Sequence, residues 1–305
     1  MPTFNAEVKN AFDKSVPSIS SILESNDTRK VIEITLASVF ACLGLSETEA
    51  REVVCYVIKE AIGSSECCIY ERNVHRYLDE RGVISLLTTV RQNRQSLIYR
   101  QIRDFIPPHS AVLDVGCGDG GLAKAIAGAG NRVSLCDVCE HAKVSSIGLP
   151  FALFSQGEPL PYDAEFDVVL MSSVLHHSDD PVALIADCAR VLNGNGRLVV
   201  VESVYGVDPP GANPANQRTS YFMALDHEVQ RLSSMFFDHL CNRVFRYSEA
   251  PAAKVNVPFN FNTPLGWNTL FCNAGFEVMQ TVHLGVDHAY VALYHTLHAL
   301  VKSDI

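Results

Sequence analysis

Residues 111–121 read AVLDVGCGDGG, and this stretch decides the fold. Its first five residues form a short apolar run that is typical of a buried strand. Glycines then recur from residue 116 to residue 121, where missing side chains let a backbone turn sharply and approach a ligand closely. The stretch therefore predicts a strand, a ligand-binding glycine loop and the start of a helix.

The rest of the C-terminal two thirds repeats this rhythm. Further apolar runs, separated by helical patterns, occupy residues 132–137, 151–154, 166–172 and 197–203. Strands that alternate with helices indicate a parallel sheet covered on both faces. Two more runs, 276–284 and 289–297, are too close together for a crossover helix and must be antiparallel. We predict an α/β, Rossmann-like, doubly wound and mostly parallel seven-stranded sheet with an antiparallel last hairpin.

Two other parts of the chain read differently. Residues 1–106 are mostly helical, and the Ser46 to Glu49 spacing predicts a capping box that starts a new helix. The apolar face predicted for the preceding helix comprises Val31, Ile34, Ala37, Ala41 and Leu45. We predict a helical N-terminal extension or lid over 1–106 and a cofactor-binding domain over 107–305. An insertion at 204–263, with a helix over 220–244, is expected to cap the substrate.

Composition narrows the function. The 305-residue chain is 48% hydrophobic and 19% charged, which is typical of a globular protein. Its net charge is -10, and a nucleic-acid binder needs cationic side chains, so DNA and RNA are not expected partners. The ten cysteines are scattered and no leader or apolar span is evident, which favours a cytoplasmic protein outside the membrane.

Two carboxylates identify the ligand class of the glycine loop. Gly116, Gly118 and Gly121 match G-x-G-x-x-G, so a nicotinamide cofactor is one alternative. Asp114 would repel a pyrophosphate there but suits a ligand with positive charge. Asp137 ends the next strand, where it can accept hydrogen bonds from ribose hydroxyls.

These features, with the segment LPYDAEFDVVLMSSVLHH at 160–177, resemble the class I S-adenosylmethionine-dependent methyltransferases of the small-molecule, type 11-like kind. The resemblance covers about residues 85–203 and the last two strands. It implies S-adenosyl-L-methionine as cofactor and S-adenosyl-L-homocysteine as product.

The resemblance also implies cofactor-binding residues. They are Asp114, Gly116, Cys117, Gly118, Asp137, Val138, Gln156, Gly157 and Ser172. Gln156 departs from the Asp that is frequent in the family, although an amide can still bond adenine. Arg94 and Tyr99, on the helix before the core, are further candidates to fold over the cofactor carboxylate.

Methyl transfer from a sulfonium needs alignment of the acceptor and removal of its proton. His176 and His177 end the fourth strand, nearest the expected methyl group, and serve either as the base or as part of a loop-fixing motif. His227 and His239 are candidate bases in the insertion. Candidate acceptor contacts are Tyr205, Tyr221, Arg231 and Arg243.

A metal centre is not predicted. Cys136 and Cys139 have the C-x-x-C spacing but lack a partner pair. A metal that orients an enolised acceptor is an alternative, with His227, His239, His283 and His288 available, yet none has ligand-type spacing.

The sequence thus predicts an enzyme that methylates a small, biosynthetic acceptor, with oxygen or nitrogen preferred. A C-methyltransferase acting on an enolisable acceptor and a cofactor-binding regulatory protein without turnover are the alternatives. A homodimer is left open.

Overall fold

The computed structural model describes residues 17–208, 216–250, 254–288 and 290–303. Residues 1–16 of the predicted extension and 209–215 of the predicted insertion lie outside the described residues. The helices are α1 (Ile19–Ile22), α2 (Asn26–Cys42), α3 (Glu47–Gly63), α4 (Cys67–Glu80), α5 (Val83–Ile102), α6 (Gly121–Gly128), α7 (Pro181–Val191), α8 (Gln217–Met223), α9 (His227–His239) and α10 (Pro264–Asn273). The strands are β1 (Ala111–Val115), β2 (Arg132–Asp137), β3 (Phe151–Leu153), β4 (Phe166–Ser172), β5 (Leu192–Val204), β6 (Phe276–Gly285) and β7 (Tyr294–Lys302).

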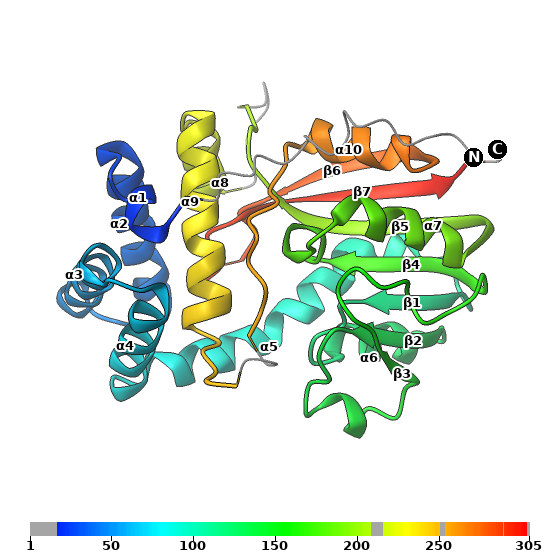
Figure 1. The fold of residues 1–305 in the computed structure, drawn as a ribbon, viewed down its shortest axis with the longest axis horizontal. Coiled ribbons are helices and arrows are strands. Elements are labelled where there is room, and N and C mark those ends of the chain that lie inside the picture. Colours follow the sequence, from blue (N-terminus) through cyan, green and yellow to red (C-terminus); the bar gives the residue numbers. More distant parts are fainter. Residues whose placement is uncertain (1–16, 209–215, 251–253, 289, 304–305) are drawn as a thin grey trace.

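The strands form one seven-stranded sheet in the order β3-β2-β1-β4-β5-β7-β6 (Figure 1). The first five run parallel, and β7 pairs antiparallel with both β5 and β6. The predicted mostly parallel, doubly wound sheet with an antiparallel last hairpin is therefore confirmed.

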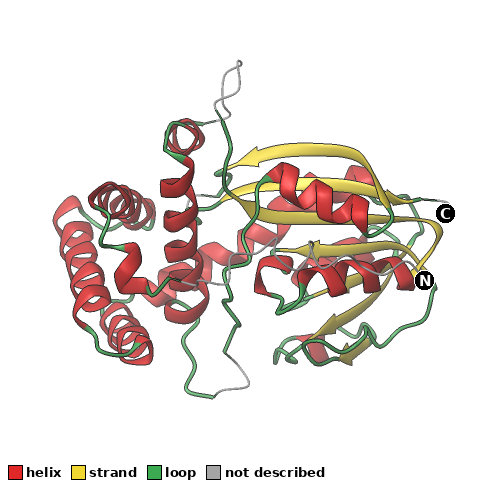
Figure 2. Cartoon of the chain, turned by 45° about the horizontal axis from the view of Figure 1, so that its top comes forward, coloured by secondary structure: helices red, strands yellow, loops and turns green. Residues whose placement is uncertain are grey.

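Helices cover both faces of the sheet (Figure 2). One face buries Val112, Leu170 and Val199 against α5 and α6. The other face buries residues such as Leu113 and Val200 against α7, α8 and α10. Both clusters consist of strand side chains that alternate between the faces, as the two-residue strand period requires.

A separate helical layer lies beyond the carboxyl ends of the parallel strands, which run toward α9 (Figure 1). Helices α1 to α4 share one apolar core with α9 and with the segment 290–293. The N-terminal extension and the insertion therefore pack on each other, and α9 of the insertion lies between helices α1 to α4 and the sheet (Figure 1). This layer is the cover over the strand ends where a ligand of such a sheet binds.

Two predicted elements were wrong in their bounds. The helix predicted over 220–244 is interrupted, because Asp226 accepts a hydrogen bond from the Glu228 amide and so caps a new helix, α9. The strand predicted over 289–297 begins only at Tyr294, which pairs with Val204 at the end of β5. Residues 290–293 lie beyond the last β5 partner and pack into the helical layer instead.

The helical region shows one success and one error. Ser46 and Glu49 form the predicted capping box at the start of α3. The predicted face of α2 was wrong at Ile34, which is 48% exposed, whereas Val31 is buried as predicted and Ile32 and Leu36 are buried instead of Ile34. Apolar residues at both positions made two helical faces plausible, and contact with α3 and α9 selects one of them.

Candidate active site

The loop after β1 is held open by backbone conformation. Gly116, Gly118 and Gly120 have φ values of 70°, 56° and 71°, in the left-handed region that favours glycine. A Cβ on Gly116 would lie 2.6 Å from Val174 Cγ2, whereas one on Gly118 would meet nothing within 4 Å. The loop thus packs on one side and leaves open space beside Gly118.

Asp114 is a buried carboxylate with a free acceptor. Its side chain lies at the carboxyl end of β1 with the residue 2% exposed, and Oδ2 has no hydrogen-bond partner among the described residues. Burial, followed by the nearby charge of Asp137, raises the pKa of Asp114 to about 8. A buried polar atom without a partner costs free energy, so this position suits a ligand that donates a hydrogen bond or carries positive charge.

Asp137 faces the same loop from the end of β2. Its Oδ2 accepts a hydrogen bond from the Gly118 amide at 2.8 Å, and its Oδ1 accepts one from the Val138 amide at 2.7 Å. The Cys139 amide also donates to Oδ1, at 3.4 Å. These three bonds orient the carboxylate at the sheet edge, and Oδ2 keeps a lone pair. Val138 is exposed beside it, whereas Cys117 is buried.

Gln156 and Gly157, which are predicted to lie beside the adenine, are in the loop that follows β3. Gln156 Oε1 accepts a hydrogen bond from the Asp179 amide at 3.4 Å, so this side chain bridges to the loop after β4. Gly157 has a φ of 81° and turns the chain there.

Helix α5 lies over the glycine loop. The Gln95 amide donates a hydrogen bond to Asp119 and fills the space that a Cβ on Gly121 would need. The neighbouring Arg94 donates to Ser173 Oγ at 3.1 Å, next to Ser172 at the end of β4. Tyr99, in contrast, packs against the apolar core of the sheet. The extension therefore contributes Arg94 and Gln95 to the edge of the sheet.

The loop after β4 is filled by side chains. His176 is buried, and its Nδ1 lies 2.5 Å from Glu202 Oε2. Glu202 Oε1 also accepts hydrogen bonds from the Val174 and Leu175 amides. Burial opposes the imidazolium form, but the charges and hydrogen bonds of Glu202 and Asp238 outweigh it and raise the pKa of His176 to about 10.

Asp238, from α9, joins this cluster. Its Oδ1 lies 3.4 Å from His176 Nε2 and 3.5 Å from His177 Nε2. His177 Nδ1 is 2.8 Å from the Asn256 carbonyl oxygen. Burial and the charge of His176 lower the pKa of His177 to about 4. The structure thus brings His176 and His177 together and ties both to the insertion.

The other candidates in the insertion have separate partners. His227 Nε2 is 2.9 Å from Asp208 at an exposed position, and Arg231 pairs with Glu228 on the surface of α9. His239 and Arg243 both contact Glu71 of α4, at 3.3 Å and 3.0 Å. These contacts place His239 and Arg243 in the helical layer.

The two tyrosines differ in the same way. Tyr205 packs against the core of the helical layer, and Tyr221, on α8, is 37% exposed. Their roles toward an acceptor remain predictions.

Several functional-site residues were not anticipated. Glu202 and Asp238 are buried acids. In the sequence, Glu202 is visible only as a charge within an apolar run, and Asp238 only as a charge on the buried side of an amphipathic helix. A second pair lies at the start of β7, where His295 Nδ1 is 3.2 Å from Asp287 Oδ1. His295 is buried, and its Nε2 has no hydrogen-bond partner among the described residues. Only the pairing of β7 with β5 brings this histidine to the strand ends.

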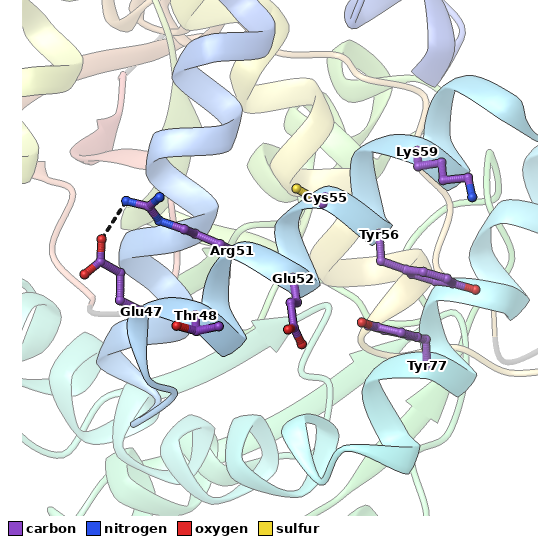
Figure 3. A pocket seen from close by; sticks show the side chains of 8 residues that line it. All are labelled: Glu47, Thr48, Arg51, Glu52, Cys55, Tyr56, Lys59 and Tyr77. Atoms are coloured by element: carbon purple, nitrogen blue, oxygen red, sulfur yellow. Dashed lines mark hydrogen bonds and ion pairs between the residues drawn. The ribbon is translucent and has the colours of Figure 1, made fainter.

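A large surface hollow, of about 810 Å³, lies elsewhere (Figure 3). It is lined by α3 and α4, including Arg51, Lys59 and the stacked rings of Tyr56 and Tyr77. Because it lies on the helical layer rather than at the strand ends, it is not the candidate active site.

Comparison with known proteins agrees with this geometry. Residues 113–200 match the family described as "Methyltransferase domain", of type 11. This segment contains the glycine loop, Asp137 and the loop after β4, and the strand order is that of the class I methyltransferase fold. Residues 113–200 of the chain are therefore similar to a type 11 methyltransferase domain.

Particular relatives match part of the chain. A ubiquinone biosynthesis O-methyltransferase of Thiobacillus denitrificans is 39% identical over 98 residues, which cover 28% of this chain and 40% of the relative. One of Hahella chejuensis is 31% identical over 141 residues, which cover 43% of this chain and 58% of the relative. The chain thus spans about half the length of the curated relatives it matches.

Among solved structures, a Burkholderia thailandensis 1,6-didemethyltoxoflavin-N1-methyltransferase with bound S-adenosylhomocysteine aligns with a TM-score of 0.47 and 19% identity. The alignment covers 76% of this chain and 86% of that protein. In the part of the chain that the structure describes, no helix is long and apolar enough to cross a membrane.

Proposed function

We propose that the protein binds S-adenosyl-L-methionine at the carboxyl ends of β1 and β2 and transfers its methyl group to a small molecule. The observation that carries this proposal is the buried, unpartnered Asp114 Oδ2 beside a glycine loop held open at Gly118. The family match over 113–200 supports it.

The residues present fit this cofactor. Asp114 offers an acceptor to a cationic group, and the open space at Gly118 admits a ligand close to the backbone. Asp137 is oriented by three amides, and its Oδ2 has a lone pair for a ribose hydroxyl. Val138, exposed beside it, offers an apolar contact to a base.

The cofactor supplies a methyl group that is already activated on a sulfonium. The protein then has to bind, orient and exclude water. Helix α5 covers the loop through Gln95, and α9 covers the strand ends through Asp238. Arg94, held at Ser173, places a positive charge at the end of β4, where it can orient an acceptor.

The acceptor belongs to the proposal only as a class. The names of the relatives and neighbours include O-, N- and C-methyltransferases, so the preference for oxygen or nitrogen stays a prediction. A C-methyl acceptor and a regulatory protein without turnover stay as alternatives. The division into 1–106 and 107–305 and the cytoplasmic location also stay predictions.

Titration calorimetry with S-adenosylhomocysteine tests the cofactor assignment. We expect Asp137→Ala to weaken binding at least about tenfold, since each lost buried hydrogen bond costs ~1–3 kcal/mol. Asp163→Ala, at an exposed position outside the loop, is the matched control and should bind normally. Equal affinity of both variants would remove Asp137 from the site. Turnover of a metabolite panel then separates an enzyme from a regulator.

A further inference from the structure

We propose that His176, His177 and Asp238 form a binding site for Zn²⁺ that joins the loop after β4 to α9. The three side chains offer ligand atoms that lie within 4.8 Å of one another. Two imidazoles and a carboxylate are a ligand set that zinc accepts, with a fourth position left for water or another ligand.

The spacing of the three ligand atoms fits a metal better than a hydrogen bond. Asp238 Oδ1 lies 3.4 Å and 3.5 Å from the two Nε2 atoms. A direct bond from an imidazolium to a carboxylate would be about 2.7–2.9 Å. Two ligands that each lie ~2.1 Å from zinc at a tetrahedral angle are about 3.4 Å apart.

Both imidazoles are also oriented for metal binding. His176 Nδ1 is 2.5 Å from the Glu202 carboxylate, and His177 Nδ1 is 2.8 Å from the Asn256 carbonyl oxygen. Since each Nδ1 faces an acceptor, it carries a proton, and both Nε2 atoms face Asp238. A metal ion there would replace the proton that His176 Nε2 holds in the metal-free protein. Metal-bound histidines almost always have such a partner on the other nitrogen. Asn242 Nδ2, at 2.7 Å from Asp238 Oδ1, steadies the third ligand in the same way.

The charge of the buried cluster points in the same direction. Glu202 and Asp238 are both buried, and each lies against His176. One proton on His176 leaves the four side chains with an excess negative charge. A divalent ion with two neutral imidazoles makes the cluster neutral, which lowers the cost of burying it. Asp238 Oδ2, which has no hydrogen-bond partner in the part of the chain that the structure describes, is a further acceptor.

A second cluster provides an internal comparison. Cys67, Glu71 and His239 also offer three ligand atoms close together. There, however, Arg243 already contacts both Glu71 oxygens, at 3.0 Å and 3.1 Å. A fixed cation beside the carboxylate disfavours a metal ion, so we assign the ion to the histidine cluster alone.

Titration with Co²⁺, whose absorption reports its ligands, distinguishes the two clusters in the unmodified protein. We expect about one equivalent to bind with the intense visible bands of a tetrahedral nitrogen and oxygen site. Thiolate-to-cobalt charge transfer would place the ion at Cys67 and overturn the assignment. Absence of binding at micromolar metal would overturn it too, and would leave His176 as a proton-carrying ion pair.

Variants locate the site. After growth with added zinc, the wild type and His239→Ala should carry about one zinc per chain by mass spectrometry, and His177→Ala should carry at least about tenfold less. Retained zinc in His177→Ala would contradict the proposal. Circular dichroism shows whether that variant folds, and Asp238→Asn, which keeps the side-chain volume, serves as the second test. Metal content is measured without cofactor or acceptor, so its outcome is independent of methyl transfer.

Discussion

Two buried carboxylates at the carboxyl edge of the sheet, Asp114 of β1 and Glu202 of β5, behave in opposite ways. Asp114 has an oxygen without a hydrogen-bond partner among the described residues, and burial raises the pKa of this carboxyl to about 8. Glu202 is as deeply buried, but two amides and His176 hydrogen-bond to it, and its pKa falls below the usual value.

The difference separates a carboxyl that is left for a ligand from one that holds the protein's own side chain and loop in place. The glycine loop beside Asp114 is formed by residues that follow it directly in the sequence. This loop leaves the carboxyl oxygen available as an acceptor for a ligand. Distant side chains build the loop around Glu202 and satisfy it within the protein. A buried acid that nothing in the fold satisfies is thus the better marker of a binding site.

The largest change in stability is expected from Glu202→Ala. Removing one partner of a buried ion pair should lower the free energy of unfolding by about 3–5 kcal/mol, because His176 and two amides lose their acceptor. Urea denaturation measures this. Glu228→Ala, which removes a surface pair with Arg231, should cost only about 0–1 kcal/mol. Similar losses in both variants would show that Glu202 is not a structural anchor.

A smaller effect is expected in the glycine loop from Gly116→Ala. A side chain at a φ of 70° and 2.6 Å from Val174 Cγ2 should cost about 1–3 kcal/mol of unfolding free energy and weaken cofactor binding. The double variant Gly116→Ala/Val174→Ala removes the overlap but keeps the backbone strain. Gly194→Ala, where a Cβ meets nothing within 4 Å, is the control and should change stability by less than about 0.5 kcal/mol. A loss at Gly116 no larger than at Gly194 would refute the packing argument.

The smallest effect is expected from Asp114→Asn, which should stabilise the cofactor-free protein rather than destabilise it. In the unfolded chain this carboxyl ionises near pH 4, whereas in the folded protein it stays protonated until about pH 8. In this pH range the folded state therefore binds one more proton than the unfolded state does. The stability that this proton contributes is lost as the pH rises.

Asparagine resembles the protonated acid. Relative to the wild type, the free energy of unfolding of the variant should therefore rise by at least about 1 kcal/mol between about pH 5 and about pH 8.5. Denaturation at the two pH values measures this, with the exposed Asp163→Asn as control. A pH-independent difference would mean that Asp114 ionises normally.

The comparison also explains what could be predicted. Strand β1, the glycine turn and Asp137 follow one another within thirty residues, so their chemistry is visible in the order of the letters. The capping box at Ser46 is local for the same reason. The interrupted helix after residue 223 and the late start of β7 depended on a cap and on strand pairing, which apolar patterning does not resolve.

By itself, the sequence determined the alternation of strands and helices, the glycine loop and the two acids beside it, because each rests on neighbouring residues. Only the tertiary structure decided which other side chains meet at that edge. Arg94 reaches Ser173, and Asp238 reaches His176, across 79 and 62 positions of the chain. Such pairs form because the helical layer packs over the sheet and buries charges that then need partners. No residue spacing in the sequence predicts them.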